Sequence, residues 1–450
     1  MKGRHLLLGT GLVAALALPL TASATNGYFA HGYGMKAKGM AGAATATAED
    51  TFGGAVNPAK MAFVGNRIDF GVDLFSPRRT SSRQGSDFFG FGGLYDGEAK
   101  SDSNYFLIPE FGYNRMVNPN LALGVTVYGN GGMNTDYNTP VAGGGQAFAP
   151  SCAGAPSNLL FGCGKLGVGL IQLIVAPTLA YKVNPTNAIG ISPLLGYQRF
   201  EVDGLQAFDD DLGLGFGSFS SSPGNVTNRG HDDSTGWGVR IGWMGQISNT
   251  VTLGAAYSSK MEMSEFDKYK GLFAEQGDFA IPENYNIGIA VKATPALTVA
   301  FDIQRINYSG VKSVNNGVTN TLVSPGSDLL GTDNGSGFLW RDQTTYKLGI
   351  EYQYNPTLVL RGGINYGKSP VRNDIDSVSF NILAPGVVET HLTLGATWTL
   401  ESGAEVTVAY MHAFENKVTG PSATALLGVG GTETLKMYQD SIGIAFGWKM

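Results

Sequence analysis

Strict alternation of apolar residues with small or polar residues is the feature that most limits how this chain can fold. It recurs in short stretches from residue 67 to the last residue. The clearest stretches are RIDFGVDL (67–74), WGVRIGW (237–243), YNIGIAVK (285–292), LTVAFDIQ (297–304), YKLGIEYQY (346–354), HLTLGATW (391–398) and SIGIAFGWKM (441–450). Because successive side chains of a β-strand point to opposite faces, this period predicts strands with one apolar and one polar face. We therefore expect an all-β fold.

The composition of the two faces separates two all-β architectures. In a soluble sandwich the apolar face lies inside, and the other face is solvated and polar. Here the apolar face is rich in aromatic side chains, such as Tyr346, Tyr352 and Tyr354, whereas the opposite face carries Gly and few charges. This pattern is typical of a transmembrane barrel, with lipid outside and a polar or plugged lumen. Since every backbone amide in lipid must be paired, the barrel must be closed.

Six short turn signals divide the alternating stretches into hairpins. They are Asn118-Pro119, Asn184-Pro185, Ser248-Asn249, Thr294-Pro295, Asn355-Pro356 and Ser402-Gly403. Longer segments rich in Gly, Ser, Asn and Asp lie between them. Six turns and two chain ends give seven hairpins, which predicts a 14-stranded antiparallel barrel in residues 67–450, with short periplasmic turns and long outer loops.

The two ends of the chain point to export into an outer membrane. Residues 1–24 combine a basic start, an apolar run and a final Ala-Ser-Ala, which predicts a signal peptide for the Sec pathway. A membrane anchor is the alternative, although the apolar run is short. Removal of Lys2 and Arg4 changes the formal net charge from −6 to −8, so no basic surface favours nucleic acid. The final strand ends Trp448-Lys449-Met450, similar to terminal strands that the barrel-assembly machinery reads.

Residues 25–66 precede the first alternating stretch and follow a different pattern. They are rich in Ala and Gly, without alternation, and Met40–Glu49 has the composition of a helix. A disordered tail is one interpretation. We favour a plug of short helices, because small residues can pack closely against a Gly-rich wall. The expected fold is thus a barrel with an N-terminal plug in its lumen.

Several segments resemble one protein family. They are the Asn57-Pro58-Ala59 element of the plug, IQLIVAPTLAYKV (171–183), WRDQTTYKLGIEYQYNPTLVLRGGINYGKSPV (340–371) and VTVAYMHAFENKV (406–418). Together they are similar to the FadL/TodX (OmpP1) family of outer-membrane transporters for long-chain fatty acids and other hydrophobic compounds. The resemblance runs from about residue 25 to 450. It implies passive uptake, with capture at an extracellular groove, transfer to an internal pocket and lateral exit at a kink of the third strand.

The resemblance directs attention to the third strand, LALGVTVYGNGGM. Gly129, Gly131 and Gly132 interrupt its alternation where such a kink would lie, and Gly inside a strand marks a bulge or bend. An ordinary strand end is the alternative. Tyr28 and Phe29, near the mature N-terminus, are candidates to plug or line the pocket.

Two cations and one loop complete the candidate site. A fatty carboxylate would be met by Arg, and Arg341 shares lumen parity with Lys347. Arg199 resembles a family position near the ligand headgroup, but simple alternation places it outward unless Pro193 marks a bulge. For both, a structural ion pair inside the barrel is the alternative.

The long loop before the fourth strand carries the two cysteines of the chain. Cys152 and Cys163 are expected to form a disulfide, because the chain is exported. Between them, the apolar Leu159, Leu160 and Phe161 are expected either to form part of the capture groove or to pack the loop onto its neighbour.

No sequence motif favours an enzyme or a cofactor. The chain has no Gly-x-Ser-x-Gly and no Cys/His metal cluster. A lipase with a Ser–His pair on adjacent strands is a remote alternative, and a general porin or an adhesin-type barrel is a stronger one. We expect a monomer without cofactor or metal whose partners are a hydrophobic substrate, outer-membrane lipid, lipopolysaccharide and the assembly machinery.

Overall fold

A closed antiparallel β-barrel makes up most of the protein. The computed structural model describes residues 26–450 except 214, 216 and 325, so the predicted signal peptide lies outside the described residues. The barrel strands are β1 (Arg67–Gln84), β5 (Phe106–Asn118), β6 (Leu121–Tyr137), β7 (Leu166–Asn184), β8 (Asn187–Asp203), β9 (Asp232–Gln246), β10 (Val251–Ser258), β12 (Asn284–Thr294), β13 (Leu297–Ile306), β14 (Gln343–Asn355), β15 (Leu358–Gly367), β16 (Thr390–Thr399), β17 (Glu405–Pro421) and β18 (Thr432–Lys449). Each pairs with its neighbours in sequence, and β18 pairs with β1 to close the barrel. The predicted 14-stranded fold is confirmed.

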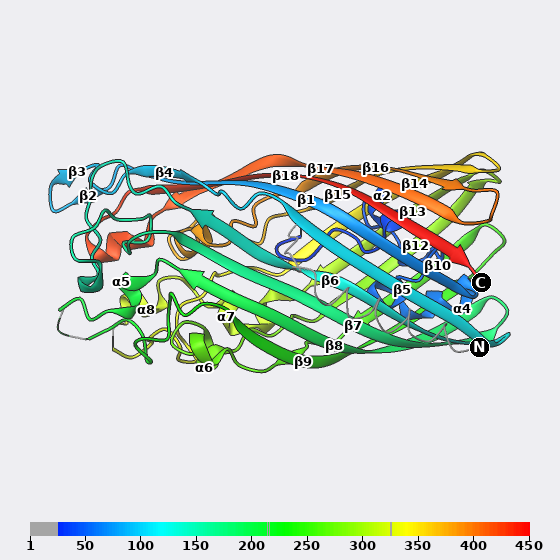
Figure 1. Ribbon diagram of the computed structural model, residues 1–450, viewed down its shortest axis with the longest axis horizontal. Helices are drawn as coiled ribbons and strands as arrows, with labels where there is room; N and C mark the ends of the chain where they lie inside the picture. Colours follow the sequence, from blue (N-terminus) through cyan, green and yellow to red (C-terminus); the bar gives the residue numbers. More distant parts are fainter. Residues whose placement is uncertain (1–25, 214, 216, 325) are drawn as a thin grey trace, which may run out of the picture.

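All six predicted turns join consecutive strands at one end of the barrel. For example, β5 ends at Asn118 and β6 begins at Leu121, and β14 ends at Asn355 before β15 begins at Leu358. The C-terminus lies at this same end, and the long loops form a layer at the opposite end (Figure 1). Outer-membrane barrels have short periplasmic turns and long outer loops, so we call the turn end the periplasmic end and the loop layer the outer end.

The loop layer contains only short elements. They are β2 (Asp87–Phe88), β3 (Phe91–Gly92), β4 (Gly97–Lys100), η2 (Pro150–Cys152), α5 (Gln206–Asp209), β11 (Glu262–Met263), η3 (Asp267–Tyr269), α6 (Ala274–Gly277), η4 (Tyr308–Gly310), α7 (Lys312–Asn315), α8 (Asn320–Val323), η5 (Phe380–Ile382) and η6 (Ala423–Leu427). In the part of the chain that the structure describes, the helices are too short or too polar to cross a membrane.

The wall has the two faces that its alternation requires. On β14, Tyr346, Leu348 and Ile350 are each 46% exposed on the outer face, whereas Thr345 and Lys347 between them are buried in the lumen. An apolar outer face of this kind is compatible with lipid, because its side chains carry no polar group that would lose hydrogen bonds to water.

The segment before β1 is folded inside the barrel. It contains α2 (Met35–Gly39), α3 (Gly53–Val56), η1 (Pro58–Lys60) and α4 (Met61–Val64), and nearly all its residues are buried. Glycines of the wall make room for it. A Cβ added to Gly349 would lie 2.7 Å from Met40 Cβ, and one added to Gly242 would lie 2.1 Å from Asn57 Oδ1. The high glycine content therefore serves close packing between wall and plug.

The Asn57-Pro58-Ala59 element anchors the plug to the wall. The Asn57 side-chain amide donates to the carbonyls of Thr45 and Trp243, each at 2.9 Å, while its oxygen accepts from the Ala59 amide at 3.1 Å. Asn57 thus caps η1. Pro58 occupies the first position, where a backbone N–H would have no partner within the helix.

Ion pairs hold the rest of the plug. Lys36 Nζ lies 2.7 Å from a carboxylate oxygen of Glu405, and Lys38 Nζ lies 2.9 Å from Asp73. Arg361 lies 2.8 Å from Glu49. We call residues 35–64, which these pairs fix, the plug base.

Candidate functional site

The third strand of the barrel, β6, separates from its neighbour halfway along its length. β5 and β6 pair from Asn118–Leu121 up to Phe111–Val127, but Phe106–Glu110 of β5 pairs only with β1. The pairing of β6 with β7 shifts register between Gly129 and Gly131, and the lumen-facing set changes from Tyr128 and Asn130 to Met133 and Thr135. A bulge of this kind bends a strand and increases its twist. We call the unpaired wall between Phe106–Glu110 and the outer half of β6 the seam.

The first described residues of the chain lie against this bend. The Ala30 amide donates to the Asn130 carbonyl at 3.1 Å, and the Gly132 amide donates to the Tyr28 carbonyl at 3.0 Å. Phe29 forms a β-bridge with Gly131. A Cβ on Gly131 would lie 1.6 Å from the Tyr28 carbonyl oxygen, so only glycine permits this approach. We call residues 26–33 the arm.

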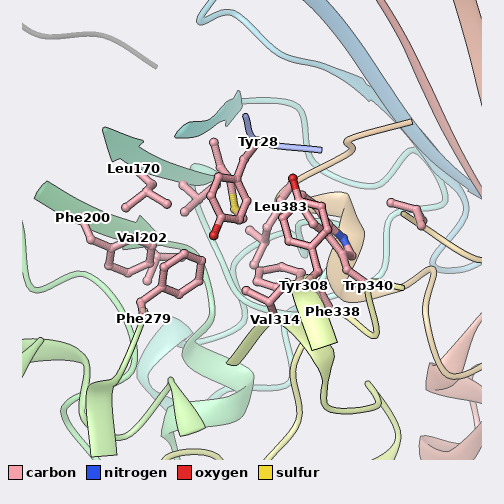
Figure 2. Close-up of a cluster of buried hydrophobic side chains, with 14 of the residues drawn as sticks. Tyr28, Leu170, Phe200, Val202, Phe279, Tyr308, Val314, Phe338, Trp340 and Leu383 are labelled. Atoms are coloured by element: carbon pink, nitrogen blue, oxygen red, sulfur yellow. The ribbon is translucent and has the colours of Figure 1, made fainter. Parts of the chain in front are cut away.

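The arm inserts Tyr28 into a cluster of buried rings. Its ring centroid lies 5.4 Å from Tyr308, 5.7 Å from Trp340 and 6.0 Å from Phe279, distances typical of favourable aromatic pairs. Figure 2 shows Tyr28 between Leu170, Phe200, Val202 and Phe279 on one side and Tyr308, Phe338 and Trp340 on the other. The Tyr308 hydroxyl donates to the Asn26 carbonyl at 2.5 Å. Burial raises the pKa of the Tyr28 and Tyr308 phenols well above their usual value, so both stay neutral.

Two narrow cavities lie near the arm and share Met133 as a lining residue. The first, of about 30 Å³, lies beneath the loop layer, and its lining includes Phe200, Phe273, Phe279, Phe338 and Leu383. Its lining is apolar apart from Ser313 and Ser336.

The second cavity, of about 20 Å³, lies between the arm and the seam. Its lining includes Tyr28, Phe75, Arg79, Trp340 and Met437. Each cavity has room for roughly one or two water molecules. Tyr28 of the arm lines the second cavity and packs on Phe279, which lines the first, so the arm lies beside the route between the two cavities.

The structure places Arg199 outside the candidate site. It lies on the outer face of β8, where Nε donates to Asp233 at 2.8 Å. β8 pairs with β9 through Pro193 without a register shift, so the bulge considered for Pro193 is absent from these strands and alternation continues to Arg199. The prediction of a headgroup contact at Arg199 is wrong, and the ion pair that Arg199 forms lies on the outer face and not inside the barrel.

Arg341 is also engaged elsewhere. Its guanidinium donates twice to the Ser369 carbonyl, at 2.9 and 2.7 Å, and it does not line either cavity described above. Arg341 thereby ties the start of β14 to the loop after β15. The expectation that it meets a ligand carboxylate is not supported by this placement.

The predicted capture residues of the outer loop are buried. Leu159, Leu160 and Phe161 are at most 2% exposed. Phe161 stacks on Phe148 at 4.7 Å between ring centroids, and the Arg83 guanidinium lies 4.7 Å from the same ring. The three residues pack the loop onto its neighbours and do not form an open groove, which corrects that part of the sequence interpretation.

Cys152 and Cys163 form a disulfide in this loop. It closes the 11-residue separation between them and fixes the loop around the buried Leu159–Phe161 segment.

Sequence reasoning missed most of the residues around Tyr28. Phe279, Tyr308, Phe338 and Trp340 lie in or beside long loops, where no periodicity marks a side chain as buried. The lumen position of Arg79 could have been predicted, because alternation places Arg79 on the same face of β1 as Asp69 and Asp73.

Comparison with known proteins agrees with this geometry. Residues 163–448 match the family described as outer membrane protein transport protein (OMPP1/FadL/TodX). No curated protein matches the chain.

Three solved structures illustrate the similarity of fold. A Pseudomonas aeruginosa FadL homologue is 16% identical, over 94% of this chain and 99% of that chain, with a TM-score of 0.68. The P. putida toluene transporter TodX is 17% identical, over 93% and 99%, with a TM-score of 0.64. The Ralstonia pickettii toluene transporter TbuX is 18% identical, over 93% and 99%, with a TM-score of 0.62. At such low identity these likenesses show the fold alone. Because the family match covers more than half of the sequence, this chain belongs to the OMPP1/FadL/TodX family of outer-membrane transport proteins.

Proposed function

We propose that the protein carries small hydrophobic compounds, long-chain fatty acids among them, passively across the outer membrane and releases them sideways through the seam. One observation carries this proposal. The arm, whose Tyr28 lines one cavity and packs on Phe279 of the other, is hydrogen-bonded to β6 at the point where the wall is unpaired. A single movement of the arm would therefore connect the buried cavity with the gap in the wall.

The order of steps follows from the geometry. A substrate enters through the loop layer and occupies the cavity lined by Phe200, Phe279 and Phe338, where its apolar surface is removed from water. Expansion of this cavity displaces Tyr28 and breaks the arm's bonds to Asn130 and Gly132. The substrate then passes along the second cavity and leaves through the seam into lipid, which spares it a passage through water.

The plug favours this path over that of a general porin. Residues 35–64 fill the lumen on the periplasmic side of the arm and are fixed to the wall by the ion pairs of Lys36, Lys38 and Glu49. A porin needs a water-filled lumen along its whole length. Sideways release needs only the arm to move.

The proposal includes the partners and the route of assembly. Export by the Sec pathway, folding by the barrel-assembly machinery from the Phe446–Trp448 end, contact with lipopolysaccharide and a monomeric state belong to it. The proposed role needs no cofactor.

Uptake of labelled oleate and labelled toluene, in cells with and without the protein, tests the proposal. Cells that carry the protein are expected to take up at least one of the two faster. The double variant Tyr28→Ala/Phe29→Ala is expected to lose most of this gain, because the displaced rings couple the cavities. Heat-modifiable migration on gels verifies assembly. Normal import by an assembled double variant would contradict arm gating and favour a simple pore.

A further inference from the structure

Arg79 is a buried cation without a carboxylate partner among the described residues. It lies on the lumen face of β1 and is 5% exposed. Its two terminal nitrogens donate to the backbone carbonyls of Asn134 and Ser103, and its Nε has no hydrogen-bond partner. The side chain thus reaches from β1 to β6 across the seam, and part of its hydrogen-bonding capacity is unused.

The other arginines on the same face of β1 are neutralised. Arg67 lies 2.8 Å from Asp69 and 2.6 Å from Glu405, and Arg83 lies 2.5 Å from Glu433. A buried charge without a counter-ion is costly, and proteins normally pair it. The contrast along one strand indicates that the counter-ion of Arg79 is supplied by a ligand and not by the protein.

The surroundings of Arg79 define the chemistry of that ligand. Phe75, Met437 and Trp340 line the same cavity, and the Phe106 ring lies 5.8 Å from the guanidinium carbon. These walls accept hydrocarbon. The guanidinium is a planar fork that matches a carboxylate in a bidentate pair. One cation in an apolar cavity therefore fits one anionic head on an apolar chain.

We propose that Arg79 is a carboxylate-binding residue, which selects hydrocarbon monocarboxylic acids over neutral hydrocarbons as they pass from the buried cavity to the seam. This inference rests on the proposed function and assigns the substrate class of that path. A bound carboxylate accepts the hydrogen bonds that now hold the carbonyls of Asn134 and Ser103. Recognition of the acid thereby releases β6 from β1.

Binding of 12-bromododecanoate and 12-bromododecanol to the purified full-length protein tests this assignment. The two probes share a tail and differ in the head, and bromine quenches the fluorescence of Trp340, which lines the cavity with Arg79. A Trp340→Phe variant measures the quenching of the tryptophans on the outer wall, which is then subtracted. Arg79→Gln removes the charge, and Arg79→Lys keeps the charge without the fork.

The matched control is Arg78→Gln on the neighbouring position of β1. Arg78 lies on the outer side, where it donates to the Tyr105 hydroxyl at 2.6 Å, so its loss removes an equal charge without touching the cavity.

We expect Arg79→Gln to weaken binding of the acid about tenfold or more, the loss typical of a charged hydrogen bond. Binding of the alcohol should change less than threefold, Arg79→Lys should be intermediate, and Arg78→Gln should match the wild type. Equal weakening of both probes by Arg79→Gln would overturn the assignment and make Arg79 a strand tether.

Two further outcomes distinguish failure of the Arg79 assignment from failure of the proposed transport function. If the wild type binds the acid no more tightly than the alcohol, the assignment fails even where a variant does not assemble, and the transport proposal stands. If the wild type binds neither probe and imports neither oleate nor toluene, the proposed function itself fails.

Discussion

The arm and the plug base are adjacent in sequence and share one lumen, but different forces hold them. The base, residues 35–64, is fixed by buried ion pairs such as Lys38–Asp73 and Arg361–Glu49. The arm, residues 26–33, takes part in no ion pair among the described residues. It is held by backbone hydrogen bonds to β6 and by ring packing around Tyr28.

This difference indicates which part can move. Breaking a buried ion pair by loss of one partner costs about 3–5 kcal/mol. A backbone hydrogen bond contributes a net of about 0.5–1.5 kcal/mol, and an apolar ligand that replaces the rings restores much of the lost packing. The arm can therefore move at modest cost while the base keeps the lumen closed to water. Four predictions test this contrast.

The largest expected effect is on the base. Lys38→Met leaves the buried carboxylates of Asp73 and Glu110 without their cation, which lies 2.9 and 3.6 Å from them. We expect a loss of about 3–5 kcal/mol in the free energy of unfolding and a rise in ion conductance in planar bilayers. Urea unfolding and single-channel recording measure the two.

Lys436→Met is the matched control for that substitution. Its exposed partner, Glu415, lies 3.7 Å away, and an exposed pair contributes about 0–1 kcal/mol. If the two variants lose equal stability, the ion pairs of the base are not its anchor.

The next effect concerns the arm. In Gly131→Val the new side chain would overlap the Tyr28 carbonyl, so we expect the arm to leave β6 while the barrel and base remain folded. Hydrogen exchange at the Ala30 and Gly132 amides should become faster by about tenfold or more, since each lost bond is worth roughly a kcal/mol.

Gly129→Ala is the control within the same bend. A Cβ there would lie 3.1 Å from Ile108 Cγ2 and 4.0 Å from the Gln172 carbonyl oxygen, and neither atom belongs to the arm. Its exchange rates should stay near those of the wild type. Retained protection in Gly131→Val would show that the arm is not held at this contact.

A local effect is expected in the loop layer, which belongs to neither region. Cys152→Ser/Cys163→Ser opens a short covalent loop, whose closure contributes roughly 3 kcal/mol to local order on the chain-entropy model. We expect faster proteolysis within residues 145–165, with stability of the plug base unchanged. Altered exchange in the arm would show that loop and arm are coupled, contrary to this separation.

The wall could be predicted from sequence because strand geometry repeats locally. Alternation fixed the two faces of each strand, the turn residues fixed the hairpins, and the loss of alternation before Arg67 marked the plug. The bend at Gly129–Gly131 was visible as an interruption of the same pattern.

The ring cluster could not be predicted in this way. Tyr28 meets Tyr308 and Trp340 only because three distant segments converge in space, and residues in long loops carry no period that shows which way they point. The predicted ligand contacts of Arg199 and Arg341 were not found for a related reason. Arg199 followed its parity to the outer face, and the carbonyl that engages Arg341 belongs to another loop.

The smallest effect is expected at Arg199, which touches neither arm nor base. Its pair with Asp233 lies on the outer face, with side chains 43% and 51% exposed. Exposed pairs of this kind contribute about 0–1 kcal/mol, so Arg199→Gln should change the free energy of unfolding by no more than that amount. Because the side chain lies outside both cavities, oleate and toluene uptake should stay within twofold of the wild type. A selective loss of oleate uptake in this variant would place acid recognition on the outer wall and remove Arg79 from that role.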